Sequence, residues 1–383
     1  MRYRKLGRSD LYVSEIGLGC EHLQGQSPDT IDAVVNAALA HGINLFDIFM
    51  SEPNVRTNIG RALAGRRDSV ILQGHIGAGW IDGQYCRTRS LESCKFFFED
   101  FMSRLQTDYV DIGMLHFVDT QEDYARVFQS EILPYAQRLK ESGVIRAIGM
   151  SSHDPVAALQ AVGSGSIDVL MFSINPAYDL LPEDTEIDDL FKAESFQNET
   201  LLGINPIRDE LYKTCEATGC AITVMKSLGA GALLHADTSP FGVALTVPQC
   251  IHYCLTRPAV ASVLVGSKSP DEVAASVAYE TTPDPERDYS VLLSSTPIYS
   301  LKGKCMYCNH CLPCPAHLDI AQINKYLDLA QLHAPIPDTV KAHYQALDHH
   351  AGDCVQCGSC EHNCPFSVPV RDRMRGAQRV FGF

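Results

Sequence analysis

Two short runs near the end of the chain place cysteine at the spacing of iron–sulfur ligands. Eight of the 15 cysteines fall between residues 305 and 364. In each run three cysteines stand at i, i+3 and i+6, and a fourth is followed by proline. The runs are Cys305, Cys308, Cys311 and Cys314, then Cys354, Cys357, Cys360 and Cys364. Three thiolates in so short a loop can occupy three corners of a cubane, while the proline turns the chain so that the fourth thiolate reaches another cluster.

This pattern predicts two 4Fe–4S clusters with exchanged fourth ligands. We expect one cluster on the first three cysteines of the first run with Cys364, and the other on the first three of the second run with Cys314. The first run has two residues before its last cysteine, where bacterial ferredoxins have three. Zinc also binds paired Cys-x-x-Cys motifs, but a zinc site needs no fourth cysteine followed by proline in each run.

The residues before these runs alternate short β-branched segments with longer amphipathic ones, which is typical of a parallel sheet covered by helices. The candidate strands are Ser14–Gly19, Asn44–Asp47, Val70–Gly74, Asp111–Leu115, Ile145–Met150, Val169–Ile174, Ala221–Val224 and Val260–Val265. The candidate helices are Thr30–His41, Leu91–Leu105, Tyr124–Ser142, Pro155–Gly163, Glu210–Thr218 and Pro248–Thr256. Eight such units match a (β/α)8 barrel.

The sequence therefore predicts an α/β fold in two domains. We expect a (β/α)8 TIM barrel over residues 1–282, a linker over 283–298, and a small, mainly helical two-cluster ferredoxin-like domain over 299–383. Helical periodicity in Ile320–Leu332 and Thr339–Leu347 supports the last assignment. A doubly wound dinucleotide fold is disfavoured, because Gly17-Leu18-Gly19 lacks the third glycine of its fingerprint. The polar segment Leu181–Arg208 is expected to be an excursion after the sixth strand that covers the site.

The composition disfavours nucleic acid and membranes as partners of this protein. The formal charge is −15, which disfavours nucleic acid because phosphate binding needs a basic surface. Apolar residues make up 45% and charged residues 20%, with no apolar run long enough to span a membrane. The N-terminus leads into no apolar signal segment, so we expect a cytoplasmic protein. The expected partner is a small-molecule substrate.

Several segments together resemble the landmarks of aldo-keto reductases, in the same order and spacing. They are Tyr3–Gly7, Gly42–Asp47, Arg104–Asp111, Leu115–His116, Ile148–His153, Val224–Gly229 and Val265–Ser267. More narrowly, the chain resembles the subfamily that carries a C-terminal two-cluster ferredoxin domain. The resemblance implies a (β/α)8 barrel with NAD(P)H-linked carbonyl chemistry at the carboxyl ends of its strands.

The resemblance also implies a catalytic tetrad of Asp, Tyr, Lys and His, of which this chain keeps two members. Asp47 and His116 match, whereas Glu52 stands at the tyrosine position and His75 at the lysine position. Without that tyrosine and lysine, ordinary carbonyl reduction should be very weak. His75 or a protonated Glu52 could act as the acid, the four side chains could hold a divalent metal, or they could be solvated loop residues. We expect the four to converge in the barrel mouth.

The family's cofactor site is matched only in part. The resemblance assigns NADP(H) or NAD(H) to Ser151, Ser152, Lys226, Gly266, Ser267 and Lys268. A lysine after the last strand could face an adenosine 2′-phosphate. However, Asp271 and Glu272 follow where the family tends to have arginine and asparagine, so retention of the nucleotide stays open.

Three functions are consistent with these residues. The leading hypothesis is an iron–sulfur oxidoreductase whose ferredoxin domain relays electrons to or from a small organic substrate in the barrel mouth. The second is a non-redox lyase or isomerase that uses Asp47, Glu52, His75 and His116, with or without a metal, while the clusters are structural. The third is an electron-transfer protein that serves a redox partner protein and whose barrel is a docking scaffold.

Overall fold

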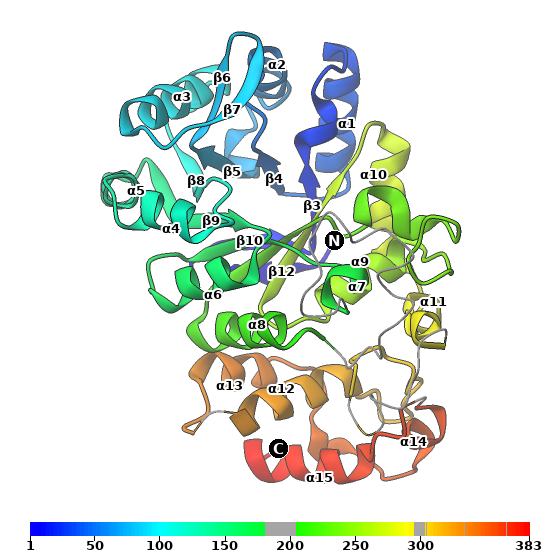
Figure 1. The fold of residues 1–383 in the computed structure, drawn as a ribbon. Coiled ribbons are helices and arrows are strands. Elements are labelled where there is room, and N and C mark those ends of the chain that lie inside the picture. Colours follow the sequence, from blue (N-terminus) through cyan, green and yellow to red (C-terminus); the bar gives the residue numbers. More distant parts are fainter. Residues whose placement is uncertain (181–203, 295–302, 304, 333, 365) are drawn as a thin grey trace. The chain divides into compact units, whose positions relative to one another are not determined.

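The computed structural model describes residues 1–180, 204–294, 303, 305–332, 334–364 and 366–383 (Figure 1). Its contacts divide the chain into two compact units. The first, which we call the barrel unit, comprises Met1–Ser173, Cys220–Ser227 and Ala259–Glu280. The second, the cysteine unit, comprises Ile174–Gly219, Leu228–Pro258 and Thr281–Phe383. No described helix is long and apolar enough to cross a membrane.

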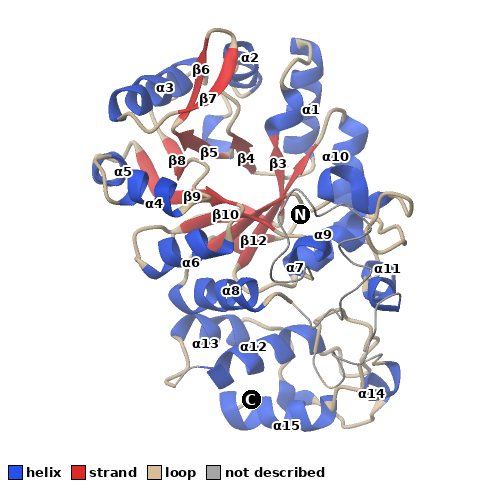
Figure 2. Ribbon diagram, in the orientation of Figure 1, coloured by secondary structure: helices blue, strands red, loops and turns tan. Residues whose placement is uncertain are grey.

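Eight parallel strands close into a barrel in the first unit (Figure 2). Their order around the barrel is β10-β11-β12-β3-β4-β5-β8-β9. The strands are β3 (Ile16–Gly19), β4 (Leu45–Ile48), β5 (Ile71–Ile76), β8 (Val110–Leu115), β9 (Ile145–Ser152), β10 (Val169–Ser173), β11 (Ala221–Met225) and β12 (Val260–Gly266). Each overlaps a strand that the sequence predicts, and the predicted fold class is confirmed.

The amino ends of the strands are closed by an apolar plug. Leu45, Val169 and Ala221, each the first residue of its strand, share one buried cluster with Leu6 and Val13. The latter two come from a hairpin in which β1 (Tyr3–Lys5) pairs antiparallel with β2 (Tyr12–Ser14) and from the turn between these strands. The carboxyl ends are therefore left for chemistry, as in other barrels of this kind.

Capped helices follow the strands of the barrel unit, and the side chains of Ser27, Ser90 and Thr120 accept backbone N–H groups at three of their N-termini. These helices are α1 (Pro28–Ala40), α2 (Pro53–Ala62), α3 (Leu91–Arg104), α4 (Gln121–Phe128), α5 (Ile132–Glu141), α6 (Pro155–Gly163) and α10 (Pro270–Val277).

The expectation of one helix over Tyr124–Ser142 is wrong, because the segment forms α4 and α5. The Ser130 hydroxyl donates to the Arg126 carbonyl at 2.6 Å and accepts from the Ile132 N–H at 3.2 Å. A serine that bonds the backbone in this way competes with the helical ladder and interrupts it.

An antiparallel hairpin that the sequence analysis does not predict is inserted directly after β5. Its strands are β6 (Ala78–Ile81) and β7 (Gln84–Arg87), paired with Trp80 opposite Tyr85. The loop residues Asp82 and Gly83 both have positive φ, 51° and 77°, as a two-residue hairpin turn requires. The hairpin lies on α3, because a side chain at Gly79 would meet the Phe97 ring at 2.6 Å.

Close packing of α2 against the end of α3 gives a testable consequence. A Cβ atom at Gly60 would lie 2.4 Å from the Arg104 carbonyl oxygen and 2.8 Å from Leu105 Cα, both of which are backbone atoms. We expect Gly60→Ala to lower the free energy of unfolding by about 1–3 kcal/mol, measured by chemical denaturation. Gly163→Ala in α6 is the control, since nothing lies within 4 Å of that position. An equal loss in both variants would contradict the packing argument.

The cysteine unit is mainly helical in its described part. Its helices are α7 (Pro176–Asp179), α8 (Pro206–Thr218), α9 (Val247–Leu255), α11 (Asp284–Arg287), α12 (Ile320–Leu332), α13 (Asp338–Gln345), α14 (Ser359–Asn363) and α15 (Val370–Phe381). The helix predicted at Ile320–Leu332 is found with the same bounds. The one predicted at Thr339–Leu347 corresponds to α13.

Buried polar contacts hold this unit together. The Asp179 carboxylate at the end of α7 accepts from Arg208 Nε at 2.9 Å on α8 and from the Tyr253 hydroxyl at 2.8 Å on α9. Arg373 on α15 donates to Asp328 on α12 at 2.5 Å. Residues 181–203 of the excursion expected over Leu181–Arg208 lie outside the described residues. Of the linker expected over 283–298, residues 284–287 form α11 and Tyr289 is buried.

Candidate functional site

Three of the polar side chains that the sequence singles out meet at the carboxyl ends of neighbouring strands. Asp47 is on β4, His75 is on β5 and His116 directly follows β8. His75 Nε2 lies 2.9 Å from Asp47 Oδ1, and the two histidine Nδ1 atoms are 2.8 Å apart. All three residues are buried, with exposed fractions of 2%, 2% and 4%. They form one hydrogen-bonded chain in the barrel.

The inner end of this chain is held by a second hydrogen bond. Gln73, two residues before His75 on β5, donates from Nε2 to Asp47 Oδ1 at 2.7 Å. Alternate residues of a strand point to the same face, so Gln73 and His75 both reach the barrel interior. Gln73 Oε1 accepts from the Thr223 hydroxyl on β11 at 3.2 Å. The Asp47 carboxylate is thus fixed with two donors on one oxygen.

Tyr85 supplies the outer end of this hydrogen-bonded chain, and it is not among the site residues predicted from the sequence. Its hydroxyl lies 2.6 Å from His116 Nε2. It is placed there by the hairpin β6–β7, and Phe49 packs against the rings of Tyr85, His75 and His116. With 42% of its surface exposed, Tyr85 is the member of the chain that solvent reaches. A phenol is therefore present at this site, although it does not come from the family's usual position.

The hydrogen bonds that join these four side chains all donate in the same direction, from Tyr85 toward Asp47. The Asp47 carboxylate only accepts, so His75 carries its proton on Nε2. A neutral His75 then accepts at Nδ1, so His116 donates from Nδ1 and accepts at Nε2 from the Tyr85 hydroxyl. The four side chains thus form a continuous path along which a proton can move.

Burial sets the protonation states at the outer end. It lowers the pKa of His116 well below its ordinary value, and a proton on His75 and the charges of Arg89 and Arg87 add to this effect. His116 is therefore neutral near pH 7. Burial also raises the pKa of Tyr85 to about 12, although Arg87 and Arg89 oppose it. Tyr85 is thus a protonated phenol at every physiological pH.

Glu52 does not join this hydrogen-bonded set of side chains, because its carboxylate caps α2. Oε1 accepts from the Asn54 N–H at 3.0 Å and Oε2 from the Val55 N–H at 2.7 Å. The Asn54 side-chain amide donates to Oε1 as well, at 2.8 Å. The observed role of Glu52 is to begin a helix.

A helix cap has a measurable stability effect. We expect Glu52→Ala to lower the free energy of unfolding by about 1 kcal/mol, because two backbone N–H groups lose their acceptor. Substrate turnover should stay within about twofold of the wild-type value. Glu52→Asp, which retains a carboxylate for the cap, is the matched control. Loss of turnover in Glu52→Ala at unchanged stability would instead place Glu52 in the chemistry.

The arrangement of ring nitrogens does not suit a divalent metal. The two Nδ1 atoms are hydrogen-bonded to each other, and the remaining nitrogen of each ring faces Asp47 or Tyr85. Within the described ranges, no group of three or more His, Cys, Asp or Glu side chains is arranged to hold a single metal ion. The geometry favours proton transfer over Lewis-acid chemistry at this site.

The segment after β12, which the resemblance assigns to an adenosine 2′-phosphate, has contacts within the chain. The Lys268 N–H donates to the Glu272 carboxylate at 2.6 Å. The His22 ring lies over Gly266, where a Cβ atom would meet it at 2.4 Å.

The other residues that the resemblance assigns to a nucleotide have contacts within the chain. The Ser151 hydroxyl accepts from the Phe117 N–H at 2.8 Å, and the Ser152 hydroxyl donates to Asp119 at 3.1 Å. Ser267 is buried after β12. Lys226 is exposed after β11, with a positive φ of 61°.

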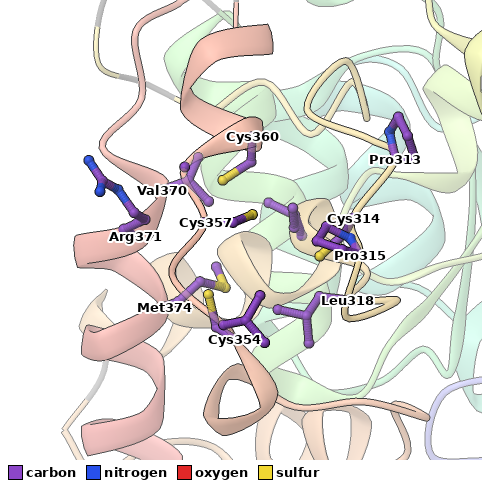
Figure 3. Close-up of a pocket in the computed structure, with 13 residues that line it drawn as sticks. Pro313, Cys314, Pro315, Leu318, Cys354, Cys357, Cys360, Val370, Arg371 and Met374 are labelled. Atoms are coloured by element: carbon purple, nitrogen blue, oxygen red, sulfur yellow. The ribbon is translucent and has the colours of Figure 1, made fainter.

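The cysteine unit brings its eight clustered cysteines to two separate cavities. One cavity is lined by Cys314, Cys354, Cys357 and Cys360, and Figure 3 shows these side chains around a common space. The other is lined by Cys305, Cys308, Cys311 and Cys364. Each cavity thus combines three cysteines of one run with the last cysteine of the other run.

The donor set of each cavity fits an iron–sulfur cluster. Four thiols line each cavity and most of its other lining residues are apolar, such as Ile320 and Val370, which border both. Cubane clusters are held by four thiolates in such surroundings. The exchange of one cysteine between the two runs is typical of two-cluster ferredoxins, and a zinc site does not require it.

Comparisons with known proteins agree with these two parts. Residues 15–246 match the model of the aldo/keto reductase family, and residues 304–369 match a 4Fe–4S dicluster domain. The chain is 29% identical to the uncharacterized oxidoreductase YqkF of Bacillus subtilis over 72% of this chain and 90% of that protein. It is 26% identical to L-galactose dehydrogenase of Arabidopsis thaliana over 73% of this chain and 88% of that protein.

A solved structure supports the fold. The aldo-keto reductase AKR11C1 from Bacillus halodurans, in its holo form, superposes with a TM-score of 0.61 at 23% identity. The match covers 78% of this chain and 97% of that one.

Proposed function

Because this chain belongs to the aldo/keto reductase family and its C-terminal region matches a 4Fe–4S dicluster domain, we propose that it is an iron–sulfur oxidoreductase that reduces a small organic substrate beside Tyr85. The hydrogen bond of 2.6 Å between the Tyr85 hydroxyl and His116 Nε2 carries the proposal. It gives the barrel a proton donor connected to a buried path, although the family's tyrosine and lysine positions hold Glu52 and His75.

The eight clustered cysteines are proposed to hold two clusters with exchanged fourth ligands. The set Cys305, Cys308, Cys311 and Cys364 would hold what we call the first cluster, and the set Cys354, Cys357, Cys360 and Cys314 the second. When bound, these clusters would supply electrons one at a time. This source of electrons does not depend on a nicotinamide nucleotide. A redox partner protein would reduce the clusters.

The proton that accompanies each electron comes along the hydrogen-bonded side chains of Asp47, His75, His116 and Tyr85. A proton stored on His75 makes that ring donate to Asp47 from Nε2 and to His116 from Nδ1. His116 then donates from Nε2 to the Tyr85 oxygen, so the Tyr85 hydroxyl is free to donate to a substrate oxygen. Asp47 stabilises the positive charge on His75, because burying a cation beside a carboxylate costs less free energy than burying it alone.

When Tyr85 donates its proton to the substrate, the protons behind it all move in the same direction, from His75 toward Tyr85. Tyr85 gives its proton to the substrate oxygen, the Nε2 proton of His116 passes to Tyr85, and the Nδ1 proton of His75 passes to His116. Each passage uses one proton and returns His75 to neutrality, while His116 exchanges one ring proton for another and stays neutral. The exposed edge of Tyr85 then admits the next proton from solvent. Two electrons and two protons convert a substrate S into SH2.

The experiment uses the loaded protein without oxygen. Clusters reduced with dithionite, after removal of excess reductant, are mixed with small aldehydes, ketones and 2-oxoaldehydes, and cluster absorbance and products are followed. We expect at least one compound to reoxidise the clusters and to be recovered as the two-electron product. Reoxidation only by another protein would favour the docking-scaffold hypothesis, and bleaching of oxidised clusters by NADPH would contradict the proposed electron source.

A further inference from the structure

We propose that Arg257, a buried arginine just after α9, is the counter-charge of the first cluster and makes it the more easily reduced of the two. The inference rests on the cluster assignment of the proposed function. Arg257 contributes a fixed positive charge that attracts an added electron. It binds no iron and is therefore a tuning residue.

Direct contacts connect Arg257 to the loop that carries the first cysteines. Nη2 donates to the Met306 carbonyl at 3.0 Å, and Met306 lies between Cys305 and Cys308 in sequence and lines the same cavity. The same nitrogen contacts the Tyr289 hydroxyl at 3.0 Å, which itself donates to the Met306 carbonyl at 3.0 Å. The guanidinium also lies over the ring of Tyr307, at 5.4 Å from its centroid. The charge is therefore held beside the cavity of the first cluster.

The guanidinium is buried with part of its hydrogen-bonding capacity unused. Arg257 is 1% exposed, and its Nε and Nη1 atoms have no acceptor among the described residues. It forms no ion pair with a carboxylate of the described chain, and its remaining contacts are neutral groups such as the Thr256 hydroxyl. A buried cation without an anion is costly, so a negative partner is expected nearby.

The carboxylates near Arg257 and around the cavity of the first cluster already have partners. The charge of Asp179 acts on Arg257, but that carboxylate is paired with Arg208 at 2.9 Å. Asp328 accepts from Arg373 at 2.5 Å and from the Tyr307 hydroxyl at 2.9 Å. Asp288 is paired with His310. An iron–sulfur cluster with four thiolates carries net negative charge that increases on reduction, and hydrogen bonds and nearby charge set its potential. The first cluster is therefore the anion that remains for Arg257.

The cavity of the second cluster has an arginine of a different kind. Arg371 lines it, but 46% of its side chain is exposed and it forms an ion pair with Glu361 at 2.8 Å. A charge that is exposed to solvent and paired with a carboxylate is strongly screened, whereas one in a buried environment is not. The two clusters therefore experience different fields, and an electron should rest on the first.

The test is an EPR-monitored redox titration of the fully loaded protein with dithionite, in which each cluster gains one electron. Signals are assigned with Cys314→Ala, which is expected to retain the first cluster alone. In Arg257→Met we expect the ratio of reduced to oxidised first cluster at a fixed potential to fall at least tenfold, equivalent to about 59 mV for one electron. Arg257→Lys, which keeps the charge, should stay within about threefold of the wild type. Arg371→Met, the matched control, should change the second cluster by less than about threefold.

Separate outcomes test the inference and the function beneath it. An unchanged ratio in Arg257→Met with both clusters loaded would overturn the role of Arg257 while leaving the cluster assignment intact. Loss of the first cluster from both Arg257 variants would also overturn it, since the lysine variant keeps the charge. If Arg257→Met alone loses its first cluster, a wild-type ratio in Arg257→Lys supports the charge role. A wild-type protein that binds no iron would refute the proposed function itself.

Discussion

Tyr85→Phe is expected to lower the rate at which substrate reoxidises the reduced clusters by about two to four orders of magnitude. General acid catalysis by a positioned side chain contributes about this much. The phenylalanine ring retains the packing against Phe49 but cannot donate to a substrate or contact His116 Nε2. The change thus disconnects the substrate from the proton held on His75 without removing any ring from the site.

Iron content and reduction by dithionite should be unchanged in this variant, because Tyr85 belongs to the barrel unit and the cluster cysteines belong to the other unit. Tyr12→Phe is the matched control, since Tyr12 is also an exposed tyrosine on a short hairpin strand. The rate is measured by stopped-flow absorbance of the clusters. A Tyr85→Phe protein that reacts at the wild-type rate would remove Tyr85 from the mechanism.

The same residue gives an expected pH dependence. Because burial raises the pKa of Tyr85 to about 12, the phenol stays protonated throughout the alkaline range that the protein tolerates. A raised pKa on an acid means that its proton is lost only at higher pH, so Tyr85 should cause no fall in rate up to about pH 10. A fall near pH 10 that is absent from Tyr85→Phe would indicate an ordinary phenol at this position.

The sequence predicts the strands well because each is a short buried run with a clear boundary. All eight barrel strands overlap their predicted positions, and with them Asp47, His75 and His116 fall at the carboxyl ends. Strand ends in a closed parallel barrel converge regardless of the helices between them. The convergence of these side chains therefore follows from topology.

Tyr85 could not be predicted in the same way, because the family's register places the tyrosine five positions after Asp47. That position holds Glu52, which the structure uses to cap a helix. The signal that could have found Tyr85 is local: Asp82-Gly83 between two short β-prone segments is a strong hairpin pattern. Even so, only the tertiary fold shows that this hairpin carries a phenol to His116.

Cys314→Ala is expected to remove one of the two clusters. The cluster that stays should be the one bound mainly by the other cysteines of the same run as Cys314. Iron should fall from about eight to about four per chain, because each cubane contains four irons and needs four thiolates. Cys314 lines a cavity with Cys354, Cys357 and Cys360, so the cluster lost should be the second. The reciprocal variant Cys364→Ala should lose the first cluster instead, because Cys364 lines the other cavity.

Iron and acid-labile sulfide analysis measures the loss, and EPR of the reduced protein identifies the remaining cluster. Cys86→Ala is the control, because Cys86 lies on β7 and lines neither cavity, and it should keep about eight irons. If Cys314→Ala and Cys364→Ala leave the same EPR signal, or if each loses the cluster of its own run, the exchange of ligands is wrong. Stoichiometric zinc without labile sulfide in the wild type would exclude clusters altogether, because only a cluster requires inorganic sulfide in addition to four thiolates.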